Sequence, residues 1–278
     1  MADRAYFGFP PVTEQFPTLS GGNWLSTYPQ SNLQTLPLSQ VARTLDASTG
    51  STSIVAVASS PQLCSVVALV GHNLSQAATI RLRCWSDTAG TVLVFDSGAS
   101  PENVWPASYT AAELEGAIKT WVRRFADPGT ITVGALEIDI ADTSNADGYV
   151  EFGFLEIAAA FDVTYNFEPG SQYGFRWRSL PVEAIGGARY LDDREHPRVW
   201  KGNFPFTTRA DAMIFFEMQR QLRMHKPVLF VPWPTETTHL LRTVMFAQQL
   251  DPGLSTMRFM TSLGLIDGVP LSLEEIIG

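Results

Sequence analysis

The segment Asp142–Gly148 brings together side chains that bind hard cations. Asp142, Asn145 and Asp147 offer oxygen atoms, and Gly148 allows the chain to turn sharply behind them. Oxygen ligands of this kind coordinate calcium, but a helix-flanked calcium loop needs a ligand at every second position and a closing Glu. A turn built from Asx hydrogen bonds explains the same residues more simply. We therefore expect a turn and no metal, and we keep calcium as the alternative.

Two tryptophans could bind sugars. Trp85 ends an alternating segment, and Trp105 lies in Asn103-Val104-Trp105-Pro106, where a loop is expected. A flat aromatic ring at a loop tip can stack on a sugar ring, although core packing and subunit contact are the commoner uses of such rings. Both residues are therefore candidate glycan or interface contacts.

The residues that usually carry catalysis are poorly arranged in this sequence. The histidines do not stand in pairs at metal-ligand spacing, the two cysteines have no nearby ligand, and the Gly-x-Ser-x-Gly motif of serine hydrolases is absent. Neighbouring carboxylates occur at Asp192-Asp193 and Glu274-Glu275, but adjacent side chains point apart, and both segments are expected to be exposed. We expect no enzyme activity and no cofactor.

Composition narrows the range of partners. A net charge of -9 and a pI near 4.9 argue against direct nucleic-acid binding, which needs a basic surface. Charged residues make up only 17% of the chain, so its surface is expected to be polar and neutral or covered by partners. No apolar run is long enough for a membrane span, and the first residues lack a signal-peptide pattern. Cys64 and Cys84 are expected to be buried free thiols, with a disulfide as the alternative.

The elements that would position these residues fall into three regions. Residues 1–36 are rich in Pro, Gly, Ser and aromatic residues without periodicity, which predicts an extended N-terminal arm packed on its own domain or on a neighbouring copy. Residues 37–166 read as short strands separated by turns, which predicts a jelly-roll β-sandwich. Residues 167–278 predict a smaller α+β domain with one prominent helix, so the fold class is mainly β.

Within the sandwich, the clearest pattern is a β-hairpin over Ile138–Ile157. Apolar and polar residues alternate up to Ala141, the Asp142–Gly148 cluster interrupts them, and alternation resumes at Tyr149. Thr110 with Glu113 predicts a short helix around Ala111–Glu115. The other predicted strands are Val41–Ala47, Ser53–Ala58, Ser65–Gly71, Thr79–Trp85, Thr91–Asp96 and Trp121–Phe125.

The last region predicts a strand–helix–strand unit. Arg198–Phe206 is extended, Thr207 or Thr208 caps a helix over Arg209–Met224, and prolines bound a strand over Pro227–Pro232. Leu271–Ile277, behind Ser272, predicts a final turn of helix.

Two blocks of residues carry a resemblance to a known family. The first is Val67–Leu74, with its Gly71-His72-Asn73-Leu74 turn, followed by Ala78–Arg83 and the Asp142–Gly153 segment; the second runs from Arg198 to Pro232. The first block resembles the galactose-binding-like jelly roll of tail and baseplate proteins from long-tailed bacteriophages. The second resembles the strand–helix–strand unit of distal-tail and minor-tail proteins.

This resemblance implies a structural virion protein at the tail tip, assembled in the host cytoplasm. It implies a homo-oligomeric ring, threefold or sixfold, that joins the tail tube to the baseplate hub and receptor-binding proteins, and it brings no catalytic residues. The alternative is a carbohydrate-binding module that contacts host surface glycans.

Overall fold

The structure is a computed structural model that divides the chain into two compact units. It describes residues 4–98, 100–110, 114, 119–125, 130–183, 186–187, 189–192, 194–205, 207–236, 238–250, 259–260, 265–266 and 268–277. We call the first unit the sandwich unit; it contains Tyr6–Phe161 and Val231–Val244. We call the second the arm-bearing unit; it contains Asp162–Phe230, Met245–Ile277 and the start of the chain up to Ala5.

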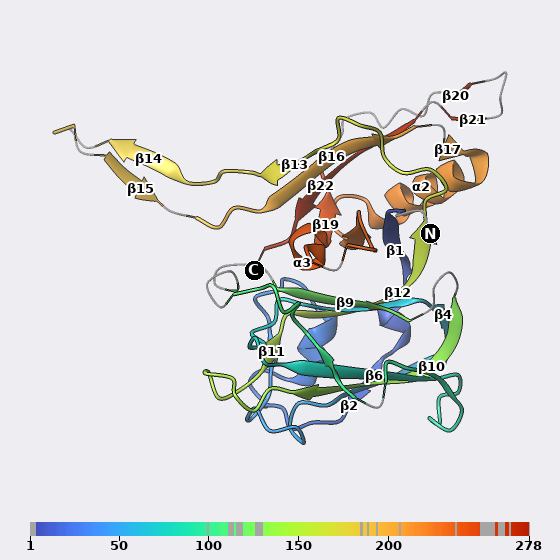
Figure 1. Ribbon diagram of the computed structural model, residues 1–278, viewed down its shortest axis with the longest axis vertical. Coiled ribbons are helices and arrows are strands. Elements are labelled where there is room, and N and C mark those ends of the chain that lie inside the picture. Colours follow the sequence, from blue (N-terminus) through green and yellow to red (C-terminus); the bar gives the residue numbers. More distant parts are fainter. Residues whose placement is uncertain are drawn as a thin grey trace. The chain divides into compact units, whose positions relative to one another are not determined.

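The sandwich unit is built from antiparallel strands in two facing sheets (Figure 1). One sheet has the order β2–β4–β10–β6–β7, with β8 beside β6, and the other contains β1–β12–β5–β9. Its strands are β1 Tyr6–Pro11, β2 Thr18–Ser20, β3 Ala42–Arg43, β4 Ile54–Cys64, β5 Val66–Val70, β6 Thr79–Trp85, β7 Leu93–Asp96, β8 Glu102–Asn103, β9 Thr120–Arg124, β10 Ile131–Ala141, β11 Glu151–Phe152 and β12 Phe154–Asp162. The mainly β fold class is confirmed.

The core between the sheets follows from the alternation in the strands. β6 buries Ile80, Leu82 and Cys84 and turns its other side chains outward, as a strand with one solvated face must. Leu69 of β5 and Leu155 of β12 belong to the same buried cluster from the opposite sheet. Thr79–Trp85 is thus a strand over its predicted range.

The predicted hairpin over Ile138–Ile157 is wrong. β10 pairs with β4 and β6, whereas β12 pairs with β5 in the other sheet, so the two strands do not pair with each other. Alternation reveals that a segment is a strand, but it does not identify the partner strand. The segment between them, including β11, crosses from one sheet to the other.

The N-terminal segment is an ordered part of the sandwich unit. β2 pairs with β4, and the 3-10 helices η1 Thr13–Gln15 and η2 Gln30–Gln34 hold the chain against the sheets. Phe7, Phe16 and Leu33 are completely buried. Of the two packing alternatives for this arm, the structure has the packing within its own chain.

A second contribution to the sandwich unit comes from late in the sequence. The short helix α3 Leu240–Thr243 lies within Val231–Val244, and Leu241 packs against the buried cluster of the sandwich. The two units divide between Phe161 and Asp162, close to the predicted boundary after residue 166. The return of Val231–Val244 to the sandwich unit was not predicted. Of the helix predicted around Ala111–Glu115, only the helical and buried Leu114 lies within the described residues.

The arm-bearing unit holds a sheet of order β13–β16–β22–β19–β18 and the helix α2. Trp200, Phe204, Phe215 and Phe230 form its buried aromatic centre. The elements are β13 Gln172–Phe175, β14 Leu180–Glu183, β15 Arg189–Asp192, β16 Arg198–Phe204, β17 Thr207–Thr208, α2 Arg209–Leu222, β18 Val228–Val231, β19 Met245–Gln249, β20 Phe259–Met260, β21 Leu265–Ile266 and β22 Val269–Glu275.

The helix α2 begins as predicted, while the end of the chain differs. The Thr208 hydroxyl accepts a hydrogen bond from the Asp211 N–H at 3.1 Å, which caps the first turn. The predicted terminal helix over Leu271–Ile277 is wrong, because this segment is the strand β22, paired with β16 and β19. Its residues Val269, Leu271 and Leu273 alternate and are buried, which is the pattern of a strand.

Candidate functional site

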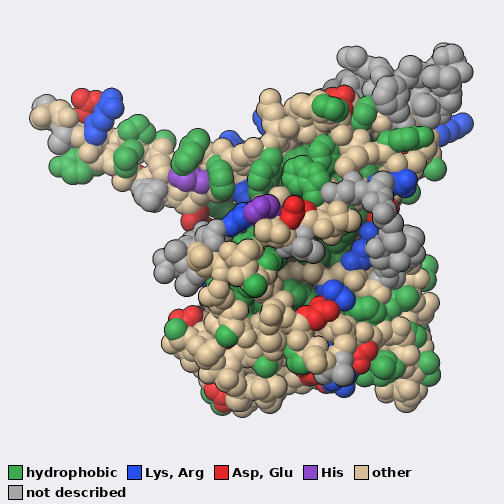
Figure 2. All heavy atoms as spheres, viewed as in Figure 1, with side chains coloured by type: hydrophobic (Ala, Val, Ile, Leu, Met, Phe, Trp, Pro, Cys, Tyr) green, Lys and Arg blue, Asp and Glu red, His purple; other side chains and the backbone are tan. Residues whose placement is uncertain are grey.

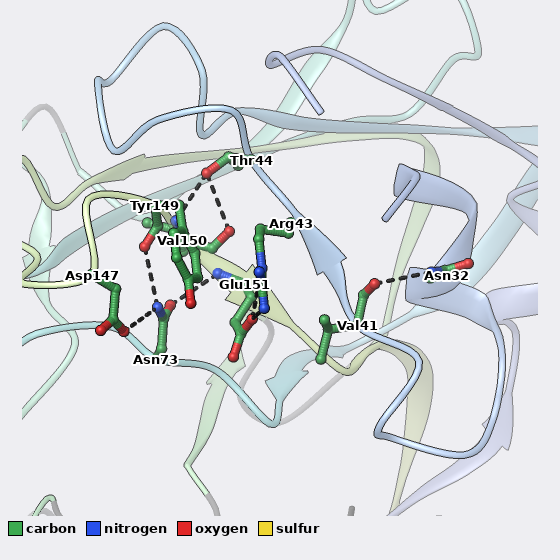
Figure 3. Close-up of polar contacts among 9 residues, drawn as sticks. All are labelled: Asn32, Val41, Arg43, Thr44, Asn73, Asp147, Tyr149, Val150 and Glu151. Carbon is green, nitrogen blue, oxygen red and sulfur yellow. Dashed lines mark hydrogen bonds and ion pairs between the residues drawn. The ribbon is translucent and has the colours of Figure 1, made fainter. Parts of the chain in front are cut away.

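One end of the sandwich carries a compact group of polar and aromatic side chains. We call it the loop-end cluster; it comprises Arg43, Asn73, Asp147, Tyr149 and Glu151, which Figure 3 shows, together with Tyr28. The predicted Gly71-His72-Asn73-Leu74 turn and the Asp142–Gly148 segment meet here, because Asn73 connects them. Gly71 and Gly148 both have positive φ, which suits glycine at these tight turns.

Asn73 ties the two loops together with both ends of its amide. Its Nδ2 donates to Asp147 Oδ2 at 2.9 Å and to the Tyr149 carbonyl at 3.1 Å. Its Oδ1 accepts from the Glu151 N–H at 2.9 Å. The side chain therefore fixes the position of the Asp147–Glu151 backbone.

Arg43 lies between two tyrosine rings in the same cluster. Its guanidinium carbon is 4.6 Å from the Tyr28 ring centroid and 4.2 Å from that of Tyr149. Its Nε and Nη2 donate to Glu151 Oε2 at 3.0 and 2.8 Å. Desolvation opposes the charge, but the hydrogen bond and charge of Glu151 outweigh it and raise the pKa of Arg43. The result is a partly exposed, preorganised group of charged and aromatic side chains.

The candidate calcium ligands form hydrogen bonds with other groups of the protein. Asp142 accepts hydrogen bonds from the Ser75 N–H at 2.8 Å, from the Ser75 hydroxyl and from Asn145 Nδ2 at 2.9 Å. Asn145 Oδ1 accepts from the Asp147 N–H at 3.0 Å. Over the part of the chain that the structure describes, no three His, Cys, Asp or Glu side chains gather as metal ligands. These contacts are those of an Asx-rich turn.

The two candidate tryptophans lie in different surroundings. Trp105 is 5% exposed, and its Nε1 donates to the Leu74 carbonyl at 3.3 Å. Its ring contacts His72 and Tyr109, so it is a core residue whose ring is not available for a sugar. Trp85 is half-buried at the end of β6, where the Arg83 guanidinium carbon lies 5.8 Å from its ring centroid.

Charged side chains cover the outer face of β6. Arg81 donates to both oxygens of Asp96, and Arg83 pairs with Glu137 at 2.9 Å and Asp139 at 2.6 Å. Desolvation, reinforced by Asp139, raises the pKa of Glu137 despite these arginines. Carboxylates of the neighbouring strands thus balance the charges of these arginines.

The described residues considered for catalysis are buried or paired within their own units. Burial, with a smaller effect from Lys119, lowers the pKa of His72 to about 3, so its imidazole is neutral. Cys64 and Cys84 are buried free thiols, as expected, and desolvation raises the pKa of Cys64 to about 12. Glu274 and Glu275 were expected to be exposed, but both are buried and each pairs with arginine. Asp192 pairs with Arg194, and Asp193 lies outside the described residues.

The arm-bearing unit presents a different kind of surface. Between β13 and β16, residues 176–197 leave the sheet as a hairpin containing β14 and β15, which we call the hairpin arm (Figure 1). Trp177 is 76% exposed, Leu191 73% and Tyr190 64%. Leu180 and Val182 are also more than half exposed, and Figure 2 shows hydrophobic side chains along this hairpin. Exposed apolar patches are common at the interaction sites of soluble proteins.

Ion pairs with two buried carboxylates of β22 lie at the base of the hairpin arm. Arg176 donates to Glu274 Oε2 at 2.8 Å, and Arg178 donates to the other oxygen of the same carboxylate. Arg198 Nε donates to Glu275 Oε2 at 2.7 Å, and this pair is almost fully buried. No pattern in the sequence identified the hairpin arm as a site.

A groove lies at this base and has a volume of about 780 Å³. We call it the base groove. Its lining residues come from β13, β16 and the segments after α2 and β19: Gln172, Tyr173, Gly174, Phe175, Arg176, Val199, Lys201, Met224 and Leu250. It combines apolar side chains with two cations.

No protein-family model and no curated protein sequence matches the chain. Among solved structures, it is similar to the family 32 carbohydrate-binding module of NanJ from C. perfringens in complex with galactose, with 14% identity, a TM-score of 0.37, and coverage of 54% of this chain and 98% of that one. Another is a module of a family 31 glycoside hydrolase from Clostridium perfringens, with 13% identity, a TM-score of 0.35, and coverage of 52% and 98%. A third is the module of AlyQ in complex with 4,5-unsaturated mannuronic acid, with 15% identity, a TM-score of 0.34, and coverage of 50% and 92%.

These similar structures are carbohydrate-binding modules, and none of the three is described as a virion protein. At these identities and TM-scores, the similarity assigns no residue roles in this chain. Among the described residues, no helix has the length and apolar character needed to span a bilayer.

Proposed function

We propose that this chain is a non-catalytic structural protein that assembles with copies of itself. The exposed hairpin arm carries this proposal, since Trp177, Tyr190 and Leu191 place large apolar surfaces in solvent in the isolated chain. The ion pairs of Glu274 and Glu275 at the arm base support it, because an arm that is held at its base loses less conformational freedom on binding.

The resemblance to tail-tip proteins supports a location for the proposed assembly. We place the protein at the tip of a bacteriophage tail, in a ring between the tail tube and the hub and receptor-binding proteins. The sandwich unit would present its loops there while the arm-bearing unit forms the ring contacts.

Sedimentation of the purified chain over a range of concentrations tests the proposal. We expect a mass several times the chain mass of 30.6 kDa, and a return to the monomer when Tyr190 and Leu191 are both replaced by Ser. Antibodies to the chain should label tail tips in electron micrographs. A chain that stays monomeric at all concentrations and labels no tail tips would rule the proposal out.

The loop-end cluster supports a second candidate, carbohydrate binding by the sandwich unit. Tyr28 is partly exposed, and Arg43 and Glu151 offer charged hydrogen-bonding groups beside it, a combination suited to sugar hydroxyls and ring faces. A glycan array probed with the protein and with Tyr28→Ala tests this candidate, and Trp85→Ala tests the half-buried tryptophan. Tyr165→Ala is the control, since Tyr165 is exposed in the other unit. The absence of array signal at high protein concentration would exclude it.

A further inference from the structure

The hairpin arm has two faces of different chemistry. β14 and β15 are antiparallel, with Leu180 opposite Asp192 and Val182 opposite Tyr190. Partners directly opposite lie on the same face of a strand pair, and alternate residues share it. One face therefore presents Leu180, Val182 and Tyr190, with the carboxylate of Asp192, half-exposed and paired with Arg194, at one end. We call this the apolar arm face.

The other face of the same hairpin is less apolar. It carries Pro181 opposite Leu191 and Glu183 opposite Arg189, whose charged groups lie 3.9 Å apart in solvent. The apolar arm face is therefore the side of these two strands that gains most from being covered.

The base groove has the complementary chemistry. Its apolar lining comes from Phe175, Val199, Met224 and Leu250, and Phe175 and Met224 are 58% and 55% exposed. Lys201 adds an exposed cation to the groove wall. Gly174, between Tyr173 and Phe175, has nothing within 4 Å of the position of a Cβ, which leaves room over the strand.

Resting on the proposed self-assembly, we propose that the apolar arm face of one copy lies in the base groove of the next, with Asp192 directed toward Lys201. Charge complementarity and the apolar character of both surfaces favour a second copy of this chain as the occupant. The two surfaces differ, so the contact is heterologous: each copy gives its arm to one neighbour and receives the arm of another. A heterologous contact closes into a ring when its rotation permits.

Cysteine cross-linking between two variants tests the direction of this contact. Tyr190→Cys places a thiol on the apolar arm face, and Met224→Cys places one in the base groove; both positions are exposed. The native Cys64 and Cys84 are buried, so they should not react. A mixture of the two variants under mild oxidation should give a covalent product of twice the chain mass, and neither variant alone should do so.

The controls separate this inference from the proposed function. Leu45→Cys, at a 55% exposed residue of the sandwich unit, should give no product with Met224→Cys. Cross-linking of Tyr190→Cys to itself would mean arm-to-arm contact and would overturn the inference while leaving self-assembly intact. An oligomer without the mixed product would do the same. A monomer at every concentration would overturn self-assembly itself.

Charge exchange provides a second measurement. Asp192→Lys and Lys201→Glu should each reduce the oligomeric fraction, and the double variant should restore it. Both side chains are exposed, so the fold should tolerate the changes. Equal loss in the double variant would contradict the pairing of Asp192 with Lys201.

Discussion

The two units differ in how far their hydrophobic side chains are exposed to solvent. In the sandwich unit, Phe16 and Phe152 are completely buried in the core between two sheets that cover each other. In the arm-bearing unit, Trp177, Tyr190 and Leu191 extend into solvent on a hairpin only two strands wide. An isolated hairpin of this kind is at best marginally stable in water. The sandwich is therefore stabilised by its own contacts, whereas the arm leaves large apolar side chains uncovered by its own chain.

The largest loss of stability is expected from removing the Arg198–Glu275 ion pair at the base of the hairpin arm. Arg198→Ala would leave Glu275 buried without its cation, which should destabilise the arm-bearing unit by about 3–5 kcal/mol. Hydrogen exchange measured by mass spectrometry should localise the loss to β16 and β22. Arg194→Ala is the matched control, because its pair with Asp192 is exposed and should contribute less than about 1 kcal/mol. Equal losses in the two variants would show that burial is not what strengthens the ion pair.

The next largest effect is expected on the pH dependence of the stability of the sandwich unit. Glu156 is buried in β12, with a long contact of 3.4 Å to the Thr13 hydroxyl and no partner for Oε1 among the described residues. Desolvation raises the pKa of Glu156 from the usual 4.5 to about 8. The native state therefore holds this proton more tightly than the unfolded state, and stability falls as pH rises between these two values.

Glu156→Gln should abolish this slope, which approaches about 1.4 kcal/mol per pH unit in the middle of the range. Denaturant unfolding from about pH 5 to pH 9 measures it. The variant should gain stability over the native chain mainly at the alkaline end. Glu14→Gln, at an exposed glutamate of the same unit, should keep the slope. A wild-type profile without this slope would show that Glu156 does not retain its proton.

A smaller effect is expected at the loop-end cluster. Asn73→Ala removes three hydrogen bonds and should cost the sandwich unit about 1–3 kcal/mol. Asn32→Ala, which removes a single bond to the Val41 carbonyl, should cost less. Thermal unfolding of both variants compares them. A larger loss for Asn32→Ala would mean that Asn73 does not hold the loops together.

The smallest effect on stability belongs to the hairpin arm. Tyr190→Ser, on the apolar arm face, should change the free energy of unfolding by no more than about 0.5 kcal/mol, since the side chain is 64% exposed. It should nevertheless weaken self-association in sedimentation measurements. Leu45→Ser, on the sandwich unit, should change neither quantity. A large loss of stability for Tyr190→Ser would mean that the arm is part of the fold of its own chain.

Local patterns in the sequence predicted individual elements well. The alternation of Thr79–Trp85 and the cap at Thr208 depend on neighbouring residues, so they can be read directly from the chain. The pairing of β10 with β4 and β6 depends on residues far apart in sequence, and the predicted hairpin failed for that reason. The terminal strand β22 was missed because its pattern is short and its partner β16 lies about seventy residues earlier.

In the candidate sites, too, local features could be predicted from the sequence, whereas contacts between distant residues could not. The Asx-rich turn at Asp142–Gly148 was predicted, but Arg43 and Tyr28 join it only through the fold. The burial of Glu274 and Glu275 could not be predicted, because it requires arginines from the arm base and β16. The apolar residues of the arm carry no sequence pattern that separates a core strand from an exposed one.

The return of Val231–Val244 to the sandwich unit has a consequence for how the protein is made. Val12 donates to the Ile157 carbonyl, and Leu241 packs on the same core, so the sandwich draws on segments that precede and follow most of the arm-bearing sequence. A domain folds as a unit once its segments have left the ribosome. Because most of the arm-bearing sequence is synthesised before Leu241 emerges, Leu241 can cover its part of the sandwich core only after that sequence has been made.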